Sequence, residues 1–212
     1  WILLSNFNDK SFLRNWIAFD LYRRMGHYAP RTVLCEVLLN SAYRGIYVFT
    51  EKIKRDKRRV DVSEPGPDAD SGDALTGGYI FKVDYHDESN SWMSDFPPLN
   101  HPDRRVYYVY VYPEPDEITA AQSGTLRRFV SDAEDAISAT ELADADLGFR
   151  KFLDIPSFID YFILGEVSRN VDAYKKSRFF FKDRDGRDGL LRAGPPWDFD
   201  WAWKNIRECA RI

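Results

Sequence analysis

The spacing of apolar residues along the chain predicts a mixture of helices and strands. Apolar positions recur at helical intervals, on one face, in the segments 9–25, 118–139 and 156–168. Runs rich in β-branched and aromatic residues predict strands in the segments 1–5, 32–39, 43–50, 79–83, 106–112, 177–182 and 190–193. The order is a helix, a hairpin, a sheet and then a mostly helical part, and this order predicts an α+β fold.

Several local signals mark where these elements begin and end. Asn8 or Asp9 is a suitable cap for the first helix, and Pro156 suits the first turn of the last one. The segment Asn40-Ser41-Ala42 separates two strand-like runs, so we expect a hairpin there. A second hairpin is expected late in the chain, with its turn at 183–189.

Composition limits the classes of protein that the chain can belong to. The chain has 212 residues, of which 44% are hydrophobic, enough for the core of one domain. Its net charge of −4 argues against a nucleic-acid partner. No apolar run approaches the roughly 20 residues that span a bilayer, so we expect no transmembrane segment. Pairing of the two cysteines, Cys35 and Cys209, is left open.

Two acidic clusters flank the late hairpin. One contains Asn170 and Asp172, and the other contains Asp198 and Asp200 on either side of Phe199. Because a hairpin returns close to its starting point, the two clusters are expected to converge. Carboxylates that are held together need a cation or a proton, and Mg²⁺ accepts oxygen ligands while leaving room for phosphate. The alternative is that these are ordinary turn and cap aspartates.

The order of these parts is that of a kinase active site. Kinases place a catalytic-loop Asp before a hairpin and a second Asp, next to Phe, after it to hold Mg²⁺. Asp172 and Asp198 occupy these two places here. The neighbouring Lys175 is a candidate for a phosphate contact, although a solvated surface charge is the simpler interpretation.

With these motifs, the chain resembles the CotH kinase family of bacterial spore coats. The stretches that carry the resemblance are Trp1 to Lys10 with Leu13 to Asn15, Val37 to Asn40 with Tyr43 to Val48 and Glu51-Lys52, Asn170 to Tyr174, and Pro196 to Ala202. The resemblance covers most of the chain, and its motifs occur together in the expected order.

The resemblance implies an atypical protein-kinase-like fold with two lobes in a single domain, 1–212. Residues 1–54 would be a partial N-lobe, and residues 118–212 a mostly helical C-lobe with a late β-hairpin and the active-site motifs. The segment 55–117 would be an insertion or linker that carries strands. The basic run 52–59 has Glu51, Asp56 and Asp61 in and beside it, and we interpret this run as solvated.

The resemblance also implies roles for individual residues. Asp172 would be the catalytic Asp, with Asn170 bracing its loop, and Asp198 would bind the metal with help from Asp200. Glu51 lies where a hinge would meet the adenine of ATP.

This sequence departs from the kinase pattern in three ways. Ser177 stands where kinases have the Asn that binds a second metal, and a hydroxyl is a weaker ligand. Asp200 replaces the glycine of the kinase Asp-Phe-Gly motif. The glycine-rich loop and the ATP-binding lysine are expected before Trp1, so the chain is interpreted as a truncated fragment that is inactive alone.

The resemblance implies ATP- and Mg²⁺-dependent phosphoryl transfer to Ser or Thr of a protein substrate. It also implies a secreted, cell-surface or spore-coat location. Two alternatives remain open. One is a catalytically inactive kinase-like coat protein that acts as a binding module, and the other is a metal-dependent enzyme that acts on a small molecule or a sugar.

Overall fold

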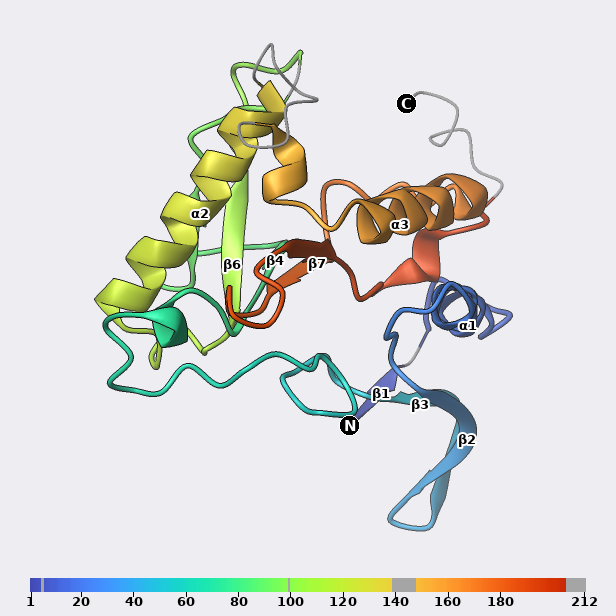
Figure 1. Ribbon diagram of the computed structural model, residues 1–212. Helices are drawn as coiled ribbons and strands as arrows, with labels where there is room; N and C mark the ends of the chain where they lie inside the picture. Colours follow the sequence, from blue (N-terminus) through green and yellow to red (C-terminus); the bar gives the residue numbers. More distant parts are fainter. Residues whose placement is uncertain (5, 99, 139–147, 205–212) are drawn as a thin grey trace.

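The computed structural model describes residues 1–4, 6–98, 100–138 and 148–204. The fold of these residues is α+β, as predicted, with α-helices beside two antiparallel sheets (Figure 1). The α-helices are α1 (Arg14–Arg24), α2 (Ala120–Ser138) and α3 (Ile155–Ser168). Short 3-10 helices are η1 (Asp73–Leu75), η2 (Phe149–Lys151) and η3 (Phe199–Trp201). Cys209 lies outside the described residues, so its pairing with Cys35 stays open.

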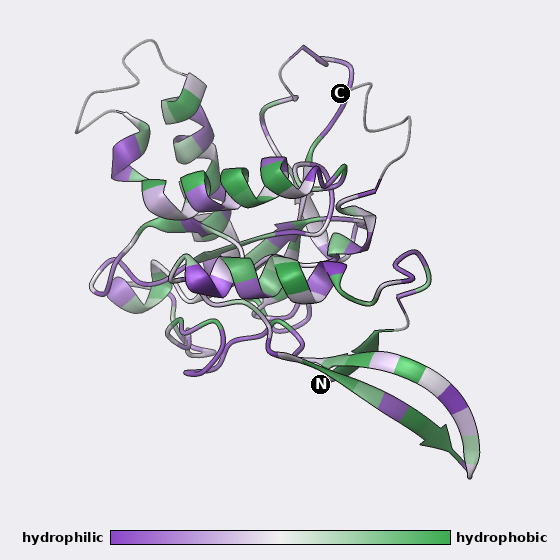
Figure 2. Ribbon diagram, turned by 90° about the vertical axis from the view of Figure 1, so that its right-hand side faces the viewer, coloured by the Kyte–Doolittle hydropathy of each residue, from purple (hydrophilic) through white to green (hydrophobic). Residues whose placement is uncertain are grey.

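The smaller sheet contains a long hairpin that projects from the body of the molecule. Its strands are β1 (Ile2–Leu4), β2 (Thr32–Leu39) and β3 (Ala42–Thr50), in the order β1-β3-β2. Asn40 and Ser41 form the turn with φ angles of 50° and 63°, the left-handed region that hairpin turns require. Figures 1 and 2 show the hairpin extending away from the other elements, with apolar residues along it.

The larger sheet forms the centre of the fold. Its strands are β4 (Tyr79–Val83), β5 (Ser91–Met93), β6 (Tyr107–Tyr112), β7 (Arg178–Lys182) and β8 (Leu191–Ala193), in the order β5-β6-β4-β7-β8. The segment 55–117 therefore supplies β4, β5 and β6, and β4 lies at the centre of the sheet. Its assignment as an insertion stays a prediction.

The two faces of the larger sheet are buried against different parts of the chain. Phe81 of β4 and Phe180 of β7 are direct cross-strand neighbours, and their rings stack 5.4 Å apart beneath α2 and α3. Ile80 and Phe179 point to the opposite face, where they pack on the segment 53–62. A third cluster joins α1, α3 and η3 around the fully buried Phe199.

The predicted helices and hairpins are confirmed, but the first helix begins later than expected. It begins at Arg14 rather than at Asn8 or Asp9. The buried carboxylate of Asp9 accepts a hydrogen bond from the Arg14 amide (2.9 Å) and further bonds from Ser11. Asp9 therefore does bond to the first amide of the helix, as its residue type indicates, but a turn separates Asp9 from the helix in the sequence.

Two glycines provide a matched test of this packing. A methyl group on Gly77 would lie 2.1 Å from the Asp183 backbone, whereas one on Gly124, exposed on α2, would contact nothing. We expect Gly77→Ala to lower the free energy of unfolding by about 3 kcal/mol, because the backbone must move. Gly124→Ala should raise it by about 1 kcal/mol, because alanine favours helix. Urea denaturation measures both, and equal stabilities would contradict the β4–β7 packing.

Candidate active site

The loop that carries Asp172 is shaped by the end of α3. Arg169 takes a left-handed conformation (φ 49°), and its amide bonds to the Glu166 carbonyl (3.1 Å). The Asn170 amide bonds to the Gly165 carbonyl (3.1 Å), which completes a Schellman-type helix end. The Asn170 side chain then accepts a hydrogen bond from the Asp172 amide (3.2 Å). Asn170 is thus bonded to the loop at Asp172, and its part in a catalytic loop stays a prediction.

The turn that carries Asp198 is held by residues near the start of the chain. Asp198 has a left-handed backbone (φ 60°), which is uncommon for a residue with a side chain. The Phe199 amide donates a hydrogen bond to the Asn15 side chain of α1 over 2.7 Å, and both residues are buried. Arg14 donates to the Asp200 carbonyl (2.7 Å), and Asn8 donates to the Asp200 carboxylate (3.0 Å).

These two loops converge on one cavity of about 750 Å³. The cavity is lined by Asn8, Asp84, Tyr85, Val171, Asp172, Lys175, Lys176, Ser177, Trp197, Asp198, Asp200 and Trp201. The structure therefore brings together the predicted residues Asp172, Lys175, Ser177, Asp198 and Asp200. Asn170 is not among the lining residues, but it lies in the loop that carries Asp172.

Negative charge dominates the electrostatics of this cavity. Partial burial of the carboxyl group, together with the charges of Asp200, Asp84 and Asp172, raises the pKa of Asp198 to about 6. The Ser177 hydroxyl, 3.5 Å from the Asp198 carboxylate, opposes this shift. A carboxylate cluster with a raised pKa is the environment in which a bound cation replaces a proton.

The basic residues at the rim are only partly engaged. Lys175 lies 3.5 Å from the Asp172 carboxylate, and its side chain is 63% exposed. Lys176 donates a hydrogen bond to the Tyr85 hydroxyl (2.6 Å) and lies over the Tyr85 ring. Both lysines therefore line the acidic cavity, and a phosphate contact of Lys175 stays a prediction.

The donor set fits Mg²⁺ as it is usually bound. Among the described residues, no group of three or more carboxylate, imidazole or thiol side chains forms a ready metal cage. Mg²⁺ needs no such cage, because it is commonly held by one or two carboxylates, waters and substrate phosphates. Asp198 and Asp200 are the carboxylates that would hold such an ion, and the open cavity leaves space for the remaining ligands.

Glu51 is not brought to this cavity. Its side chain is fully buried and pairs with Arg31 and Arg59, while the Tyr28 hydroxyl donates to it over 3.3 Å. Burial alone would raise the pKa of Glu51, but hydrogen bonds and charge from Arg31 and the charge of Arg59 outweigh it and lower the pKa. The carboxylate thus has a structural role, and an adenine contact near Glu51 stays a prediction.

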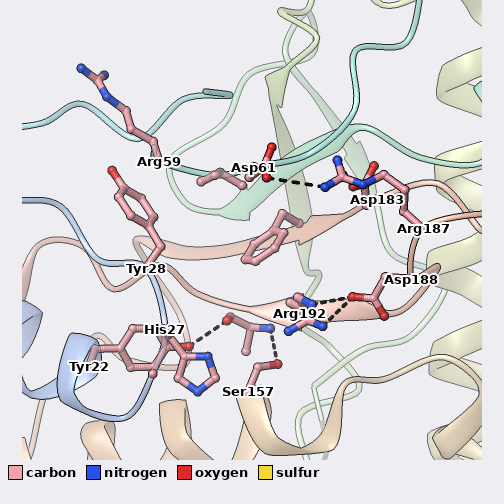
Figure 3. A pocket seen from close by; sticks show the side chains of 14 residues that line it. Tyr22, His27, Tyr28, Arg59, Asp61, Ser157, Asp183, Arg187, Asp188 and Arg192 are labelled. Carbon is pink, nitrogen blue, oxygen red and sulfur yellow. Dashed lines mark hydrogen bonds and ion pairs between the residues drawn. The ribbon is translucent and has the colours of Figure 1, made fainter. Parts of the chain in front are cut away.

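A second cavity, of about 370 Å³, adjoins this ion-pair group (Figure 3). Its charged side chains already have partners. Arg187 lies between Asp61 (3.5 Å) and Asp183 (2.9 Å), as Figure 3 shows in part, and Arg192 pairs with Asp188. These contacts tie the β7–β8 hairpin to the segment 53–62. We therefore interpret this cavity as structural and the acidic cavity as the candidate active site.

Sequence reasoning did not connect Asn8, Asp84 or Tyr85 with the acidic cavity that they line. Asp84 directly follows the predicted strand 79–83, and a polar residue at a strand end is a usable signal. Its neighbours in space come from the other end of the chain, however, so nothing local connects it to Asp198. Asn15 lies within a helix, where its sequence position gives no sign of the bond to Phe199.

Comparison with known proteins identifies the family of the chain. A family model described as CotH kinase protein matches residues 1–211. The chain therefore belongs to the CotH kinase family. A search of curated proteins found no match to the chain. In the described part of the chain, no helix is both long enough and apolar enough to cross a membrane.

The Glu51 ion pairs predict a large effect on stability. Glu51→Gln should lower the free energy of unfolding by about 3 kcal/mol, because Arg59, 11% exposed, loses its charged partner. Since the pKa of Glu51 is lowered in the folded state, this contribution is present at neutral pH and is lost as the pH falls below about 4.5. The measurement is urea denaturation between pH 3 and 7.

The matched control is Glu36→Gln, which removes an exposed carboxylate from β2. It should change the free energy of unfolding by less than about 0.5 kcal/mol. Equal effects of the two variants would contradict the structural role of Glu51.

The raised pKa of Asp198 predicts the opposite pH dependence. With metal chelated, the folded state takes up a proton near pH 6, before the unfolded state does, so stability increases as the pH falls from 8 to 5. Asp198→Asn removes this titration and the repulsion. The variant should therefore be more stable than the wild type at pH 8 and close to it at pH 5. Urea denaturation at both pH values checks this, and parallel pH profiles would disprove the assigned charge cluster.

Proposed function

We propose that the chain carries the metal- and nucleotide-binding part of a protein kinase that transfers phosphate from ATP to Ser or Thr. The observation that carries this proposal is the convergence of Asp172 and Asp198 on one acidic cavity. Membership of the CotH kinase family supports a kinase-like function. The proposal includes an atypical two-lobed kinase fold, with the smaller sheet as part of an N-lobe and the helices and late hairpin as the C-lobe.

Each residue has a distinct task in this proposal. Asp172, with its carboxylate at the cavity wall, accepts a hydrogen bond from the substrate hydroxyl and orients it for attack. Asp198 and Asp200 hold Mg²⁺, which neutralises charge on the ATP phosphates when bound. Ser177 is placed to assist the Asp198 carboxylate through their 3.5 Å contact. Lys175 is free to swing from Asp172 toward a phosphate.

The family's link with spore coats makes a secreted or cell-surface location part of the proposal. The protein substrate is defined here only by its hydroxyl side chain.

One observation favours a second function, a kinase-like shell that binds a coat or surface partner without catalysis. The β2–β3 hairpin exposes large apolar side chains, among them Val33 (62%), Leu38 (66%) and Tyr43 (59%). Apolar groups gathered on a projecting arm are typical of a protein contact surface. Ser177, a weak metal ligand, also fits this alternative.

Ligand-dependent stability of the intact protein tests the proposed function. Mg-ATP at a hundredfold excess over its Kd should raise the free energy of unfolding by about 2.7 kcal/mol. Asp198→Asn should abolish this increase, because it removes a metal ligand. Asp103→Asn, in an exposed loop between β5 and β6, is the control and should keep it.

Phosphate transfer is then followed with labelled ATP and a mixture of proteins as acceptors. Asp172→Asn should lose transfer while keeping the Mg-ATP stabilisation, because Asp172 orients the acceptor rather than the metal. Absence of stabilisation and of transfer in the wild type would favour the binding shell. Transfer to small molecules or sugars alone would exclude a protein kinase.

A further inference from the structure

A third cavity, of about 500 Å³, lies between α2 and α3 on one face of the larger sheet. Its walls are mostly apolar. They include Phe81 and Phe180 from the sheet, Val130 and Ile137 from α2, and Phe158 from α3. A volume of this size is within the range of small-molecule sites, which are typically apolar with a few polar groups. The polar groups therefore decide what the cavity can hold.

Arg178 is the positively charged residue that lines this cavity. As the first residue of β7, it lines the same cavity as Phe180, two positions along the strand. Its guanidinium lies over three aromatic rings, 5.0 Å from the centre of Phe180, 5.3 Å from Tyr161 and 5.6 Å from Tyr174. The rings stabilise the cation through their faces, but they accept none of its N–H bonds in the way that a carboxylate does.

The guanidinium of Arg178 has no anionic partner within the described part of the chain. No carboxylate lies within ion-pair distance of it, and its buried Nε has no hydrogen-bond acceptor. Other partly buried arginines do pair with carboxylates: Arg14, Arg55, Arg59 and Arg192. A partly desolvated cation with unused donors is costly, and an anionic ligand would remove this cost.

Glu134, the acidic residue that lines the same cavity, does not form an ion pair with Arg178. The Glu134 carboxylate accepts hydrogen bonds from the Ser94 hydroxyl (2.7 Å) and the Tyr108 hydroxyl (3.0 Å). Burial raises the pKa of Glu134, with smaller contributions from Asp95 and Asp135, despite these two bonds. Glu134 is therefore occupied by its own neighbours.

We propose that this cavity binds a small apolar molecule with one anionic group, such as a medium-chain carboxylate. The anionic group pairs with Arg178, and the apolar part packs against Phe81, Phe158 and Phe180. This site is distinct from the acidic cavity, because the two cavities have no lining residue in common, although Ser177 of one is adjacent in the sequence to Arg178 of the other. It requires neither Mg²⁺ nor ATP, so its test is independent of the proposed kinase function.

The test compares decanoate with uncharged decanol, each below the concentration at which it aggregates, by isothermal titration calorimetry on the metal-free protein. The wild type should bind decanoate at least about tenfold more tightly than decanol, because a charge-assisted hydrogen bond is worth roughly 1.5–3 kcal/mol. Arg178→Met keeps an unbranched, flexible apolar stem and removes the charge and the N–H donors. It should bind both probes with similar affinity.

Two further variants keep the test decisive if Arg178→Met folds poorly. Ile137 is 49% exposed at the cavity wall, so polar replacements are tolerated there. Ile137→Glu should weaken decanoate binding about fivefold or more relative to Ile137→Gln, by like-charge repulsion, and affect decanol much less. Arg150→Met, an exposed arginine that lies over Phe149 outside the cavity, should leave the preference for decanoate unchanged.

The proposal is overturned if the wild type binds the two probes equally or binds neither. It is also overturned if folded Arg178→Met retains the preference for decanoate. A purely structural Arg178 would change the stability of the protein without changing its discrimination between a charged and an uncharged probe.

Discussion

The acidic cavity depends on a buried hydrogen bond between residues 184 positions apart in the chain, from the Phe199 amide to the Asn15 side chain. This 2.7 Å bond fixes the turn that presents Asp198 on one side and Asp200 on the other. Repulsion between these carboxylates and Asp172 favours opening of that turn, so something must resist it. The resistance comes from α1, because Arg14 holds the Asp200 backbone while Phe199 fills the core between α1 and α3. The site is therefore assembled by long-range packing rather than by the local motif.

From the same arrangement, we expect the site to lower the stability of the protein in the absence of a cation. A carboxylate whose pKa is raised to about 6 is charged at neutral pH only at a cost to the folded state. The left-handed backbone of Asp198 adds strain, which proteins commonly keep only where it serves function. A divalent cation would relieve the repulsion while leaving the backbone in place. A left-handed backbone and charge repulsion at one residue therefore support the proposed cation site.

The sequence was informative where structure is local and less so where it is not. Helical periodicity located α2 and α3 closely, and apolar runs located the strands, because both signals arise from neighbouring residues. The pairing of β4 with β7 joins segments about a hundred residues apart, and no local pattern encodes it. The interpretation of the basic run 52–59 as solvated was wrong for Arg59, whose side chain is 11% exposed beside Glu51. From the sequence alone, a charged residue is expected to be exposed, and its burial becomes evident only when its ion-pair partner is known.

Ser177 and Arg178 are adjacent in the sequence but line two cavities whose unbalanced charges have opposite signs. Ser177 faces a cavity rich in carboxylates, and Arg178 lines an apolar cavity with an unpaired guanidinium. Charges of opposite sign this close in sequence would be expected to neutralise each other. The backbone keeps them apart, because Ser177 precedes β7 with a left-handed conformation (φ 51°) while Arg178 begins the strand, and the two residues line different cavities. Since folding gains nothing from keeping either charge unpaired, the separation supports the two proposed ligands of opposite charge, a cation in the acidic cavity and an anion beside Arg178.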